Sequence, residues 1–328
     1  MNRVVRAGVA LSLWVMAASS AEAKVTRYLT GNAADAVASL TGPSHDLGGG
    51  GLDVDAAIQW MIDQARGCTN CSTKIDVVIL RSTGSDGYNA SVAAMNGVDS
   101  VETLVITSAA SANTAAVEAT IKNAEVVFFA GGDQCDYVKN FKGTLVETAV
   151  ESVYAKGGSV GGTSAGHAIL GDFTYDACSG SALSSEALAN PYARTVTFTY
   201  DFFHWNHLQG TITDSHFVTR DRMGRTMAFL ARQIQDGRAT SVLSIAVDEA
   251  TSVVVDRNGL ATVMGTGAAY FVLADHAPQA CRAKTPLTYS GFKIWKVSPG
   301  GTFNLATRPT TGYYLRSVTT GVIDANPY

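Results

Sequence analysis

The sequence predicts an α/β fold of three layers, with helices on both faces of a mainly parallel sheet. Three observations lead to this prediction. Runs of branched apolar residues alternate with segments whose apolar residues recur at helical spacing. The runs are almost uninterrupted, which is typical of parallel strands covered on both faces. Glycine-rich turns follow two runs, at residues 131–134 and 161–166, and parallel sheets bind ligands at such strand ends.

The chain begins with the pattern of a secretory signal peptide. Arg3 and Arg6 precede an apolar run over residues 7–18, and Ala-Glu-Ala follows at 21–23. The run is shorter than the roughly 20 apolar residues that span a bilayer, although an uncleaved anchor is the alternative interpretation. We therefore expect cleavage after Ala23 and export to the periplasm or the medium.

The charge balance argues against two classes of partner. The chain has 24 Lys and Arg against 28 Asp and Glu, a net charge of −4, and no block of basic residues. Such a protein is a poor candidate for binding nucleic acid or an anionic membrane. The sequence leaves the oligomeric state open, a homodimer included. Residues 24–328 are expected to form a single domain.

The first half of the mature chain contains most of the α/β alternation. Residues 24–41 are expected to be a strand or irregular, and the four glycines at 48–51 a flexible turn. The expected helices are at 52–65, 114–123, 144–156 and 165–170. The expected strands are at 75–80, 104–107, 126–130 and 159–161. For the first helix, Asp53 is the expected N-cap and Gly67 the expected stop.

The second half is less regular. Residues 178–208 are interpreted as a packed insertion, and a helix is expected over 224–237. The expected strands are at 243–247, 251–255, 260–264 and 270–273. Short strands and turns follow Pro278, so residues 278–328 are interpreted as a small β extension of the same domain.

Five cysteines suit an exported protein, because disulfides persist in oxidising compartments. No second C-x-x-C accompanies Cys68 and Cys71 at zinc-finger spacing, so a small-loop disulfide, or separate partners, is expected in place of zinc. Cys178 and Cys281 are candidates to pair, although sequence alone does not decide connectivity. Cys135 is then the expected unpaired cysteine.

Residues 162–166, Gly-Thr-Ser-Ala-Gly, fit the G-x-S-x-G nucleophile elbow, in which a strand turns sharply into a helix. Small neighbours are needed because the turn is tight. Such a turn presents Ser164 to substrate, and the Ala165 amide at the helix start can stabilise an oxyanion. A glycine-rich structural loop is the alternative interpretation.

A serine nucleophile needs a base and a group that orients the base. Six histidines are candidates: His45, His167, His204, His207, His216 and His276. His216 is preferred because three arginines follow it closely, and Glu249, at a strand end, is the expected orienting acid. The competing set is Ser164, Asp248 and His276, in the chain order of α/β-hydrolase esterases.

Arg220, Arg222 and Arg225 are expected to form a carboxylate-binding wall, since a guanidinium presents a planar fork that matches a carboxylate. A solvated basic turn at a helix start is the alternative. Asp214 is a candidate to balance part of this charge.

Residues 131–134, Gly-Gly-Asp-Gln, end one strand and open a helix. Their backbone amides are candidates for the second oxyanion donor. Asp133 is expected to cap the helix, and Gln134 to bind substrate through its side-chain amide.

Four motifs together resemble the cyanophycinases, serine peptidases related to the aspartyl dipeptidases and, in fold, to class I glutamine amidotransferases. They lie in the family's order, within residues 52–274. The motifs are Gly-Gly-Asp-Gln at 131–134, Gly-Gly-Thr-Ser-Ala-Gly at 161–166, Asp-x-His-Phe at 214–217 with its three arginines, and Val-Asp-Glu-x-Thr at 247–251.

The resemblance implies a mechanism without metal or cofactor, in which Ser164 is the nucleophile, His216 the base and Glu249 the orienting acid. The implied oxyanion hole is formed by the amides of Gly132 and Ala165. The implied substrate-binding residues are Gln134, Asp214, Ser215, Arg220, Arg222 and Arg225.

The resemblance also implies a substrate, cyanophycin or a related β-linked aspartyl-arginine peptide. Ser215 departs from the family, which usually has Gln before the motif histidine, and a hydroxyl reaches less far than an amide. An esterase using His276 and a catalytically inactive protein that binds aspartyl peptides are the alternatives. An amidotransferase is not expected, because that class has cysteine at the elbow.

Overall fold

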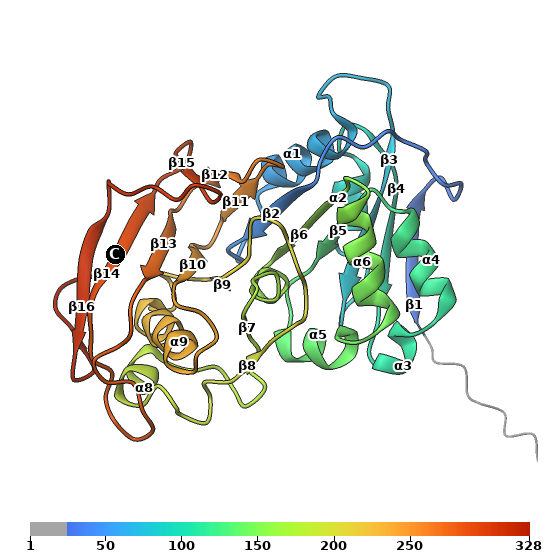
Figure 1. The fold of residues 1–328 in the computed structure, drawn as a ribbon. Coiled ribbons are helices and arrows are strands. Elements are labelled where there is room, and N and C mark those ends of the chain that lie inside the picture. Colours follow the sequence, from blue (N-terminus) through green and yellow to red (C-terminus); the bar gives the residue numbers. More distant parts are fainter. Residues whose placement is uncertain (1–24) are drawn as a thin grey trace, which may run out of the picture.

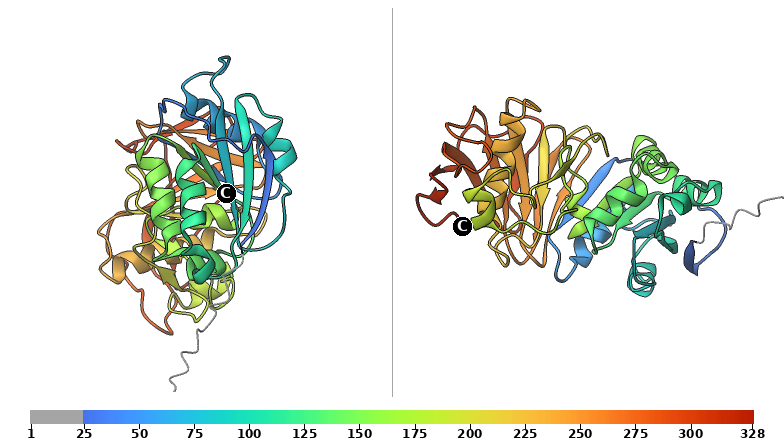
Figure 2. Two further views of the ribbon diagram at one scale, coloured as in Figure 1. Left: turned by 90° about the vertical axis from the view of Figure 1, so that its right-hand side faces the viewer. Right: turned by 90° about the horizontal axis from the view of Figure 1, so that it is seen from below.

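The computed structural model describes residues 25–328 (Figure 1). The expected signal peptide and its cleavage after Ala23 lie outside the described residues. Two sheets lie side by side along the molecule, the larger one built mostly from the first half of the chain (Figure 2). In the part that the structure describes, none of the helices combines the length and the apolar character needed to cross a bilayer.

The larger sheet has nine strands in the order β1-β4-β3-β5-β6-β2-β11-β12-β15. Its strands are β1 (Thr26–Gly31), β2 (Ser44–Gly48), β3 (Ile75–Arg81), β4 (Val98–Val105), β5 (Val126–Phe129), β6 (Ser159–Thr163), β11 (Thr251–Val255), β12 (Leu260–Gly265) and β15 (Thr302–Asn304). The central strands β4, β3, β5, β6 and β2 are parallel, and antiparallel strands flank them on both sides.

Helices cover both faces of the parallel strands, as the sequence predicts. They are α1 (Asp55–Arg66), α2 (Asn89–Ala93), α3 (Ala109–Ala112), α4 (Ala115–Asn123), α5 (Gln134–Phe141), α6 (Leu145–Ala155) and α7 (Ala165–Ala168). Alternate residues of a strand point to opposite faces. Val77 and Ile79 therefore pack with α1 and α2, while Val78 and Leu80 pack with α4, α5 and α6.

The smaller sheet has the order β17-β16-β14-β13-β10-β9. Its strands are β9 (Thr211–Asp214), β10 (Val242–Val247), β13 (Ala269–Ala274), β14 (Tyr289–Val297), β16 (Tyr314–Thr319) and β17 (Val322–Ile323). Helices α8 (Ser184–Ala189) and α9 (Met223–Gln235) pack against it, and β7 (Thr174–Tyr175) pairs with β8 (Phe198–Thr199) nearby. The strands after Pro278 continue this sheet, except β15, which pairs with β12.

One strand has no counterpart among the expected elements, and one expected helix cap is wrong. Strand β2, Ser-His-Asp-Leu-Gly, lies between β6 and β11, and each of its residues is buried. Helix α1 begins at Asp55 without a side-chain cap, because the Asp53 carboxylate accepts a hydrogen bond from Tyr88 instead (2.6 Å). Gly67 does end α1, in the left-handed conformation with φ of 72°.

The small-loop disulfide of Cys68 with Cys71 is present as expected. The expected pair of Cys178 with Cys281, which left Cys135 unpaired, is wrong, because Cys135 at the start of α5 forms a disulfide with Cys178. Cys281 is the free cysteine, and it is buried among the residues that pack around α9. The fold explains the difference, because the loop after β7 brings Cys178 to Cys135 at the start of α5, whereas Cys281 is enclosed in the core around α9.

Candidate active site

Ser164 lies at a sharp turn between β6 and α7. Its backbone has φ of 55° and ψ of −113°, values that a non-glycine residue seldom adopts. The flanking glycines are required by contact: a Cβ on Gly166 would lie 2.1 Å from the Phe129 carbonyl oxygen, and one on Gly162 would lie 2.7 Å from Gly166. The geometry therefore has the form of the elbow that the G-x-S-x-G pattern predicts.

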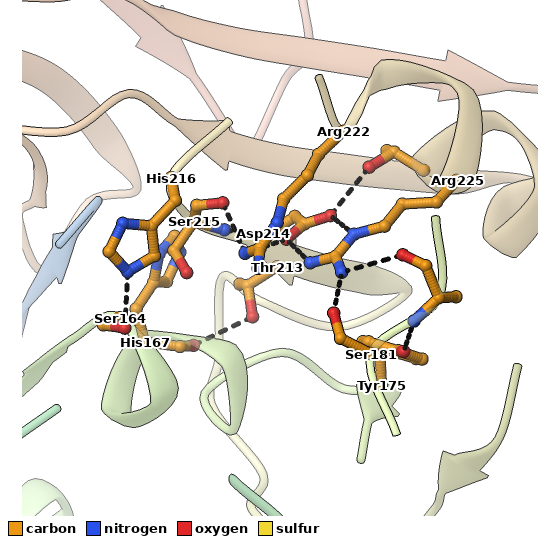
Figure 3. Close-up of polar contacts among 12 residues, drawn as sticks. Ser164, His167, Tyr175, Ser181, Thr213, Asp214, Ser215, His216, Arg222 and Arg225 are labelled. Carbon is orange, nitrogen blue, oxygen red and sulfur yellow. Dashed lines mark hydrogen bonds and ion pairs between the residues drawn. The ribbon is translucent and has the colours of Figure 1, made fainter. Parts of the chain in front are cut away.

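Ser164, His216 and Glu249 form a continuous chain of hydrogen bonds. Ser164 Oγ lies 2.7 Å from His216 Nε2 (Figure 3), and His216 Nδ1 lies 2.6 Å from Glu249 Oε1. His216 follows β9 and Glu249 follows β10, so the smaller sheet supplies the imidazole and the carboxylate. The larger sheet supplies the hydroxyl through β6.

The glycine loop, residues 48–51, joins these segments, so the expectation of a flexible turn is wrong. Its carbonyl groups accept backbone hydrogen bonds from each segment: Gly48 from Ser164 (3.0 Å), Gly49 from His216 (2.7 Å) and Gly50 from Ala250 (2.9 Å). A Cβ on Gly50 would lie 2.5 Å from the His216 ring. The loop must therefore lack side chains so that it can pass directly against the imidazole.

The electrostatics favour a neutral imidazole beside an ionised carboxylate. Burial lowers the pKa of His216, and Arg220 and Arg222 lower it further, although the hydrogen bond to Glu249 opposes them. The hydrogen bond from His216 lowers the pKa of Glu249. An ionised Glu249 accepts from Nδ1–H, so Nε2 has its lone pair free to accept the Ser164 proton.

A pocket of about 250 Å³ opens beside Ser164. It is lined by Gly132, Asp133, Gln134, Ser164, Ala165, Ala168, Ala177, Gly180, Ser181, Asp214, Ser215, His216, Arg220, Arg222 and Arg225. Every site residue that the resemblance implies lines it except Glu249, which hydrogen-bonds to the far side of the His216 ring. A Cβ on Gly131 would lie 3.5 Å from that of Ser164, so the turn of Gly131 and Gly132 lies beside the hydroxyl.

Asp214 and Arg225 form a buried ion pair at the base of the pocket. Arg225 Nε donates to Asp214 Oδ2 (2.8 Å), and Thr226 donates to the same oxygen (3.0 Å). Burial raises the pKa of Asp214, but the neighbouring Arg225 and Arg222 outweigh that effect and hold it below its usual value. Asp214 is therefore fully engaged with protein groups.

The three arginines differ in their surroundings. Arg225 is buried and Arg222 is mostly buried, donating to the Ser215 carbonyl oxygen (2.8 Å) and to Asp214 (3.3 Å). Arg220 is exposed, and among residues 25–328 its side chain makes neither a hydrogen bond nor an ion pair. Arg220 is thus the guanidinium most available to a ligand, whereas Arg225 is a structural partner of Asp214.

Asp133 and Gln134 occupy the positions that the sequence predicts. The Asp133 carboxylate caps α5 by accepting from the Cys135 backbone N–H (2.8 Å), and Gln134 is the first residue of the helix. Asp133 and Gln134 both line the pocket.

The competing set of Ser164, Asp248 and His276 is not brought together. His276 is not among the residues that line the pocket; it hydrogen-bonds with Asp275 (2.8 Å) and stacks on Tyr289. Asp248 accepts backbone hydrogen bonds from Val218 and Ala268, both at 3.1 Å, which gives it a structural role in the turn after β10.

Sequence reasoning missed two parts of the site. One is the wall formed by Ala177, Gly180 and Ser181, small residues in a segment interpreted only as an insertion. The other is Tyr328, whose hydroxyl accepts from the Met223 N–H (3.0 Å) and donates to Asp221 (2.8 Å). Tyr328 thereby supports the arginine turn, residues 217–222. A signal for the wall was present in the Asp-x-Cys pattern shared by 133–135 and 176–178.

Comparisons with known proteins place the chain near a peptidase family. It is 28% identical over 221 residues to cyanophycinases of Nostoc sp. and of Trichormus variabilis, an alignment that covers 65% of this chain and 67% of each relative. No family model matches the chain. The crystal structure of a peptidase from an acI-B1 Actinobacterium covers 81% of this chain and 98% of its own, with a TM-score of 0.56 and 14% identity, which is a similarity of fold.

These findings confirm the α/β fold class and the resemblance to cyanophycinases that the four motifs indicate. They support a peptidase-type hydrolase.

Proposed function

We propose that this cyanophycinase-like serine peptidase hydrolyses β-linked aspartyl peptides, with cyanophycin the leading substrate, through an acyl-enzyme. The observation that carries the proposal is the hydrogen-bonded line from Ser164 through His216 to Glu249, which opens into a pocket with an available guanidinium. This arrangement matches the roles of nucleophile, base and orienting acid in serine hydrolases.

In the proposed first half-reaction, Ser164 Oγ attacks the carbonyl carbon of the scissile amide, and its proton passes to His216 Nε2. Glu249 stabilises the imidazolium that forms and keeps the ring in place. The amides of Gly132 and Ala165 stabilise the oxyanion, since Gly132 lies beside the serine and Ala165 begins α7. His216 then protonates the leaving amine as the C–N bond breaks.

In the second half-reaction, water replaces the amine. His216 Nε2 takes a proton from the water as its oxygen attacks the acyl carbon. Collapse of the second tetrahedral intermediate breaks the bond to Ser164 Oγ, which regains its proton from the imidazolium. The products are the acid and the free enzyme.

The chemistry of the pocket supports an acidic peptide as substrate. Arg220 is exposed and Arg222 partly so, and each guanidinium matches a carboxylate in shape and charge. In cyanophycin the backbone is poly-aspartate and the β-carboxyls carry arginine, so cleavage would release β-aspartyl-arginine. Ser215, where the family usually has Gln, presents a shorter group beside the base, and we propose that it sets how closely the substrate approaches.

The test is turnover of cyanophycin by the purified protein, with mass spectrometry of the products. Ser164→Ala and His216→Ala should each lower kcat by at least about 10³-fold, because both groups act together in bond formation. A serine-directed fluorophosphonate should add one adduct, located on Ser164. Unchanged rates in these variants would exclude the mechanism, and binding without hydrolysis by the unmodified protein would favour a catalytically inactive binding protein.

Export is a second proposal, supported by the N-terminal sequence pattern and by disulfides that suit an oxidising compartment. Fractionation of producing cells, with mass analysis of the N-terminus, tests it. Cleavage after Ala23 is expected, and an intact N-terminus in the cytoplasm would contradict it.

A further inference from the structure

The Cys135–Cys178 disulfide joins two turns of the same design. In each turn an aspartate two residues before the cysteine accepts a hydrogen bond from the cysteine N–H: Asp133 from Cys135 at 2.8 Å, and Asp176 from Cys178 at 3.0 Å. The Cα atoms of the two cysteines are 4.9 Å apart. The pattern Asp-x-Cys thus fixes both ends of a short covalent bridge.

The residue between aspartate and cysteine lines the pocket in both turns. Gln134 lies on one wall, and Ala177 lies on the other, followed by Gly180 and Ser181. Gln134 and Ala177 are each joined by a peptide bond to one cysteine of the bridge. The bridge therefore sets the distance between two walls of the pocket.

The wall that contains Gln134 is anchored independently of the bridge. Tyr137, one turn further along α5, is buried, and its hydroxyl donates to the Ala130 carbonyl oxygen (2.7 Å). Phe141, at the end of the same helix, is also buried in the core. Helix α5 and the turn of Gly131 and Gly132 before it should keep their places if the bridge opens.

The opposite wall, the cysteine loop of residues 176–182, depends more on the bridge. Cys178, Gly180 and Ser181 are exposed, and Ala177 is held in the left-handed conformation with φ of 50°. The ends of the loop are fixed, by Thr197 and Thr199 donating to Asp176 and by Arg225 donating to Ser181 (3.1 Å). Among the hydrogen bonds, ion pairs and disulfides of residues 25–328, the bridge is the one that ties the outer turn at Cys178 to the other wall.

We propose that the Cys135–Cys178 disulfide is a positioning element of the substrate pocket, which holds the cysteine loop at the separation from Gln134 that substrate requires. Opening the bridge releases the outer turn of the loop and weakens substrate binding, while the line of Ser164, His216 and Glu249 stays intact. Only the predicted change in substrate binding rests on the proposed peptidase function; the predicted release of the loop does not.

The bridge is open to chemical reduction. A dithiol such as dithiothreitol supplies two electrons and two protons: it becomes a cyclic disulfide, and Cys135 and Cys178 become thiols. Cys178 is exposed, which gives the reductant access from that side. Reoxidation should restore the original state.

The experiment compares two double variants of the full protein. Cys135→Ala with Cys178→Ala removes the bridge, and Cys68→Ala with Cys71→Ala removes the other disulfide, which contributes no residue to the pocket. With an aspartyl peptide, the first variant should show KM raised about tenfold and kcat changed less than about twofold, whereas the second should match the unmodified protein. Fluorophosphonate labelling of Ser164 should proceed equally in all three.

Hydrogen exchange supplies a readout that does not need peptide turnover. The first variant, and the reduced and alkylated unmodified protein, should exchange faster across residues 176–182 but not across 134–141. If the unmodified protein cleaves no peptide, the peptidase proposal fails and the exchange result alone decides the inference. Equal exchange in the cysteine loop with and without the bridge, or equal KM in both double variants, would overturn it.

Discussion

Three residues that hydrogen-bond to the glycine loop have a left-handed backbone that side chains disfavour. They are Ser164, His216 and Ala250, with φ of 55°, 48° and 53°. Such residues cost of the order of 1 kcal/mol each and persist where their surroundings hold them. Here each of the three donates its N–H to a carbonyl of the glycine loop. The strained backbone positions are thus those that orient the Ser164 hydroxyl, the His216 imidazole and the segment next to Glu249.

The lowered pKa of His216 predicts the acid limb of the pH profile. The base must be neutral, so kcat/KM should fall as the pH drops through the pKa of His216, and burial places that pKa below the usual 6.5. Glu249→Gln removes the contact that raises the pKa of His216. The acid limb of the profile should therefore shift to lower pH, and kcat should fall. The measurement is kcat/KM of both proteins between pH 4 and 8. An acid limb above 6.5 would contradict the assignment.

Arg220 and Arg225 should respond differently to substitution. Arg225→Ala leaves the buried Asp214 carboxylate without its main partner and should destabilise the protein by about 3 kcal/mol. Arg220→Ala should leave thermal unfolding unchanged but raise KM about fivefold for a peptide with a free α-carboxylate, relative to its amide. Arg220→Lys, which keeps the charge, is the control. Equal effects on acid and amide would show that Arg220 does not bind the carboxylate.

At the scale of elements, a substitution in the glycine loop tests most directly whether the loop positions His216. Gly50 has φ of 88°, and an added Cβ would lie 2.5 Å from the His216 ring. Gly50→Ala should therefore displace the imidazole and lower kcat about 100-fold or more. Gly143→Ala is the matched control, because Gly143 has φ of 72° with nothing within 4 Å of the added Cβ. Similar activity in the two variants would mean that the contact with His216 is unimportant.

The sequence predicted elements well where the signal was local. Branched runs located β3 and β5, and the G-x-S-x-G pattern located β6 and the elbow at Ser164. Strand β2 was not predicted, because the partners of its polar groups are distant in the sequence. Ser44 hydrogen-bonds with Ser159 (2.7 Å), and His45 with the Val160 carbonyl oxygen (2.9 Å). Such pairings, like the Cys135–Cys178 bridge, exist only after the chain has folded.

For the whole molecule, the sequence indicated one mainly parallel sheet with a β extension, whereas residues 25–328 form two large sheets and the small pair of β7 with β8. Strands β9, β10 and β13 precede Pro278 and already form the second sheet, which the later strands extend. Single-strand patterns do not reveal which sheet a strand joins, because that depends on long-range pairing. The predicted site residues nevertheless came together, since they lie at strand ends of both sheets where these meet.

The end of the described chain should influence substrate binding. Tyr328→Phe removes the hydroxyl that contacts Met223 and Asp221 in and beside the arginine turn, but it keeps the ring against Phe217. Loss of these hydrogen bonds should raise KM about threefold with little change in kcat. Tyr313→Phe is the control, as its hydroxyl makes no hydrogen bond within residues 25–328. A kcat effect without a KM effect would contradict this role.

The docking of Tyr328 also bears on where the protein can be joined to other molecules. A purification handle or a fluorophore fused behind this residue would emerge beside the guanidinium groups that we expect to meet the substrate. The strand β1 lies at the opposite end of the molecule (Figure 1). Immobilising the protein from that side would leave the entrance of the pocket facing the solution.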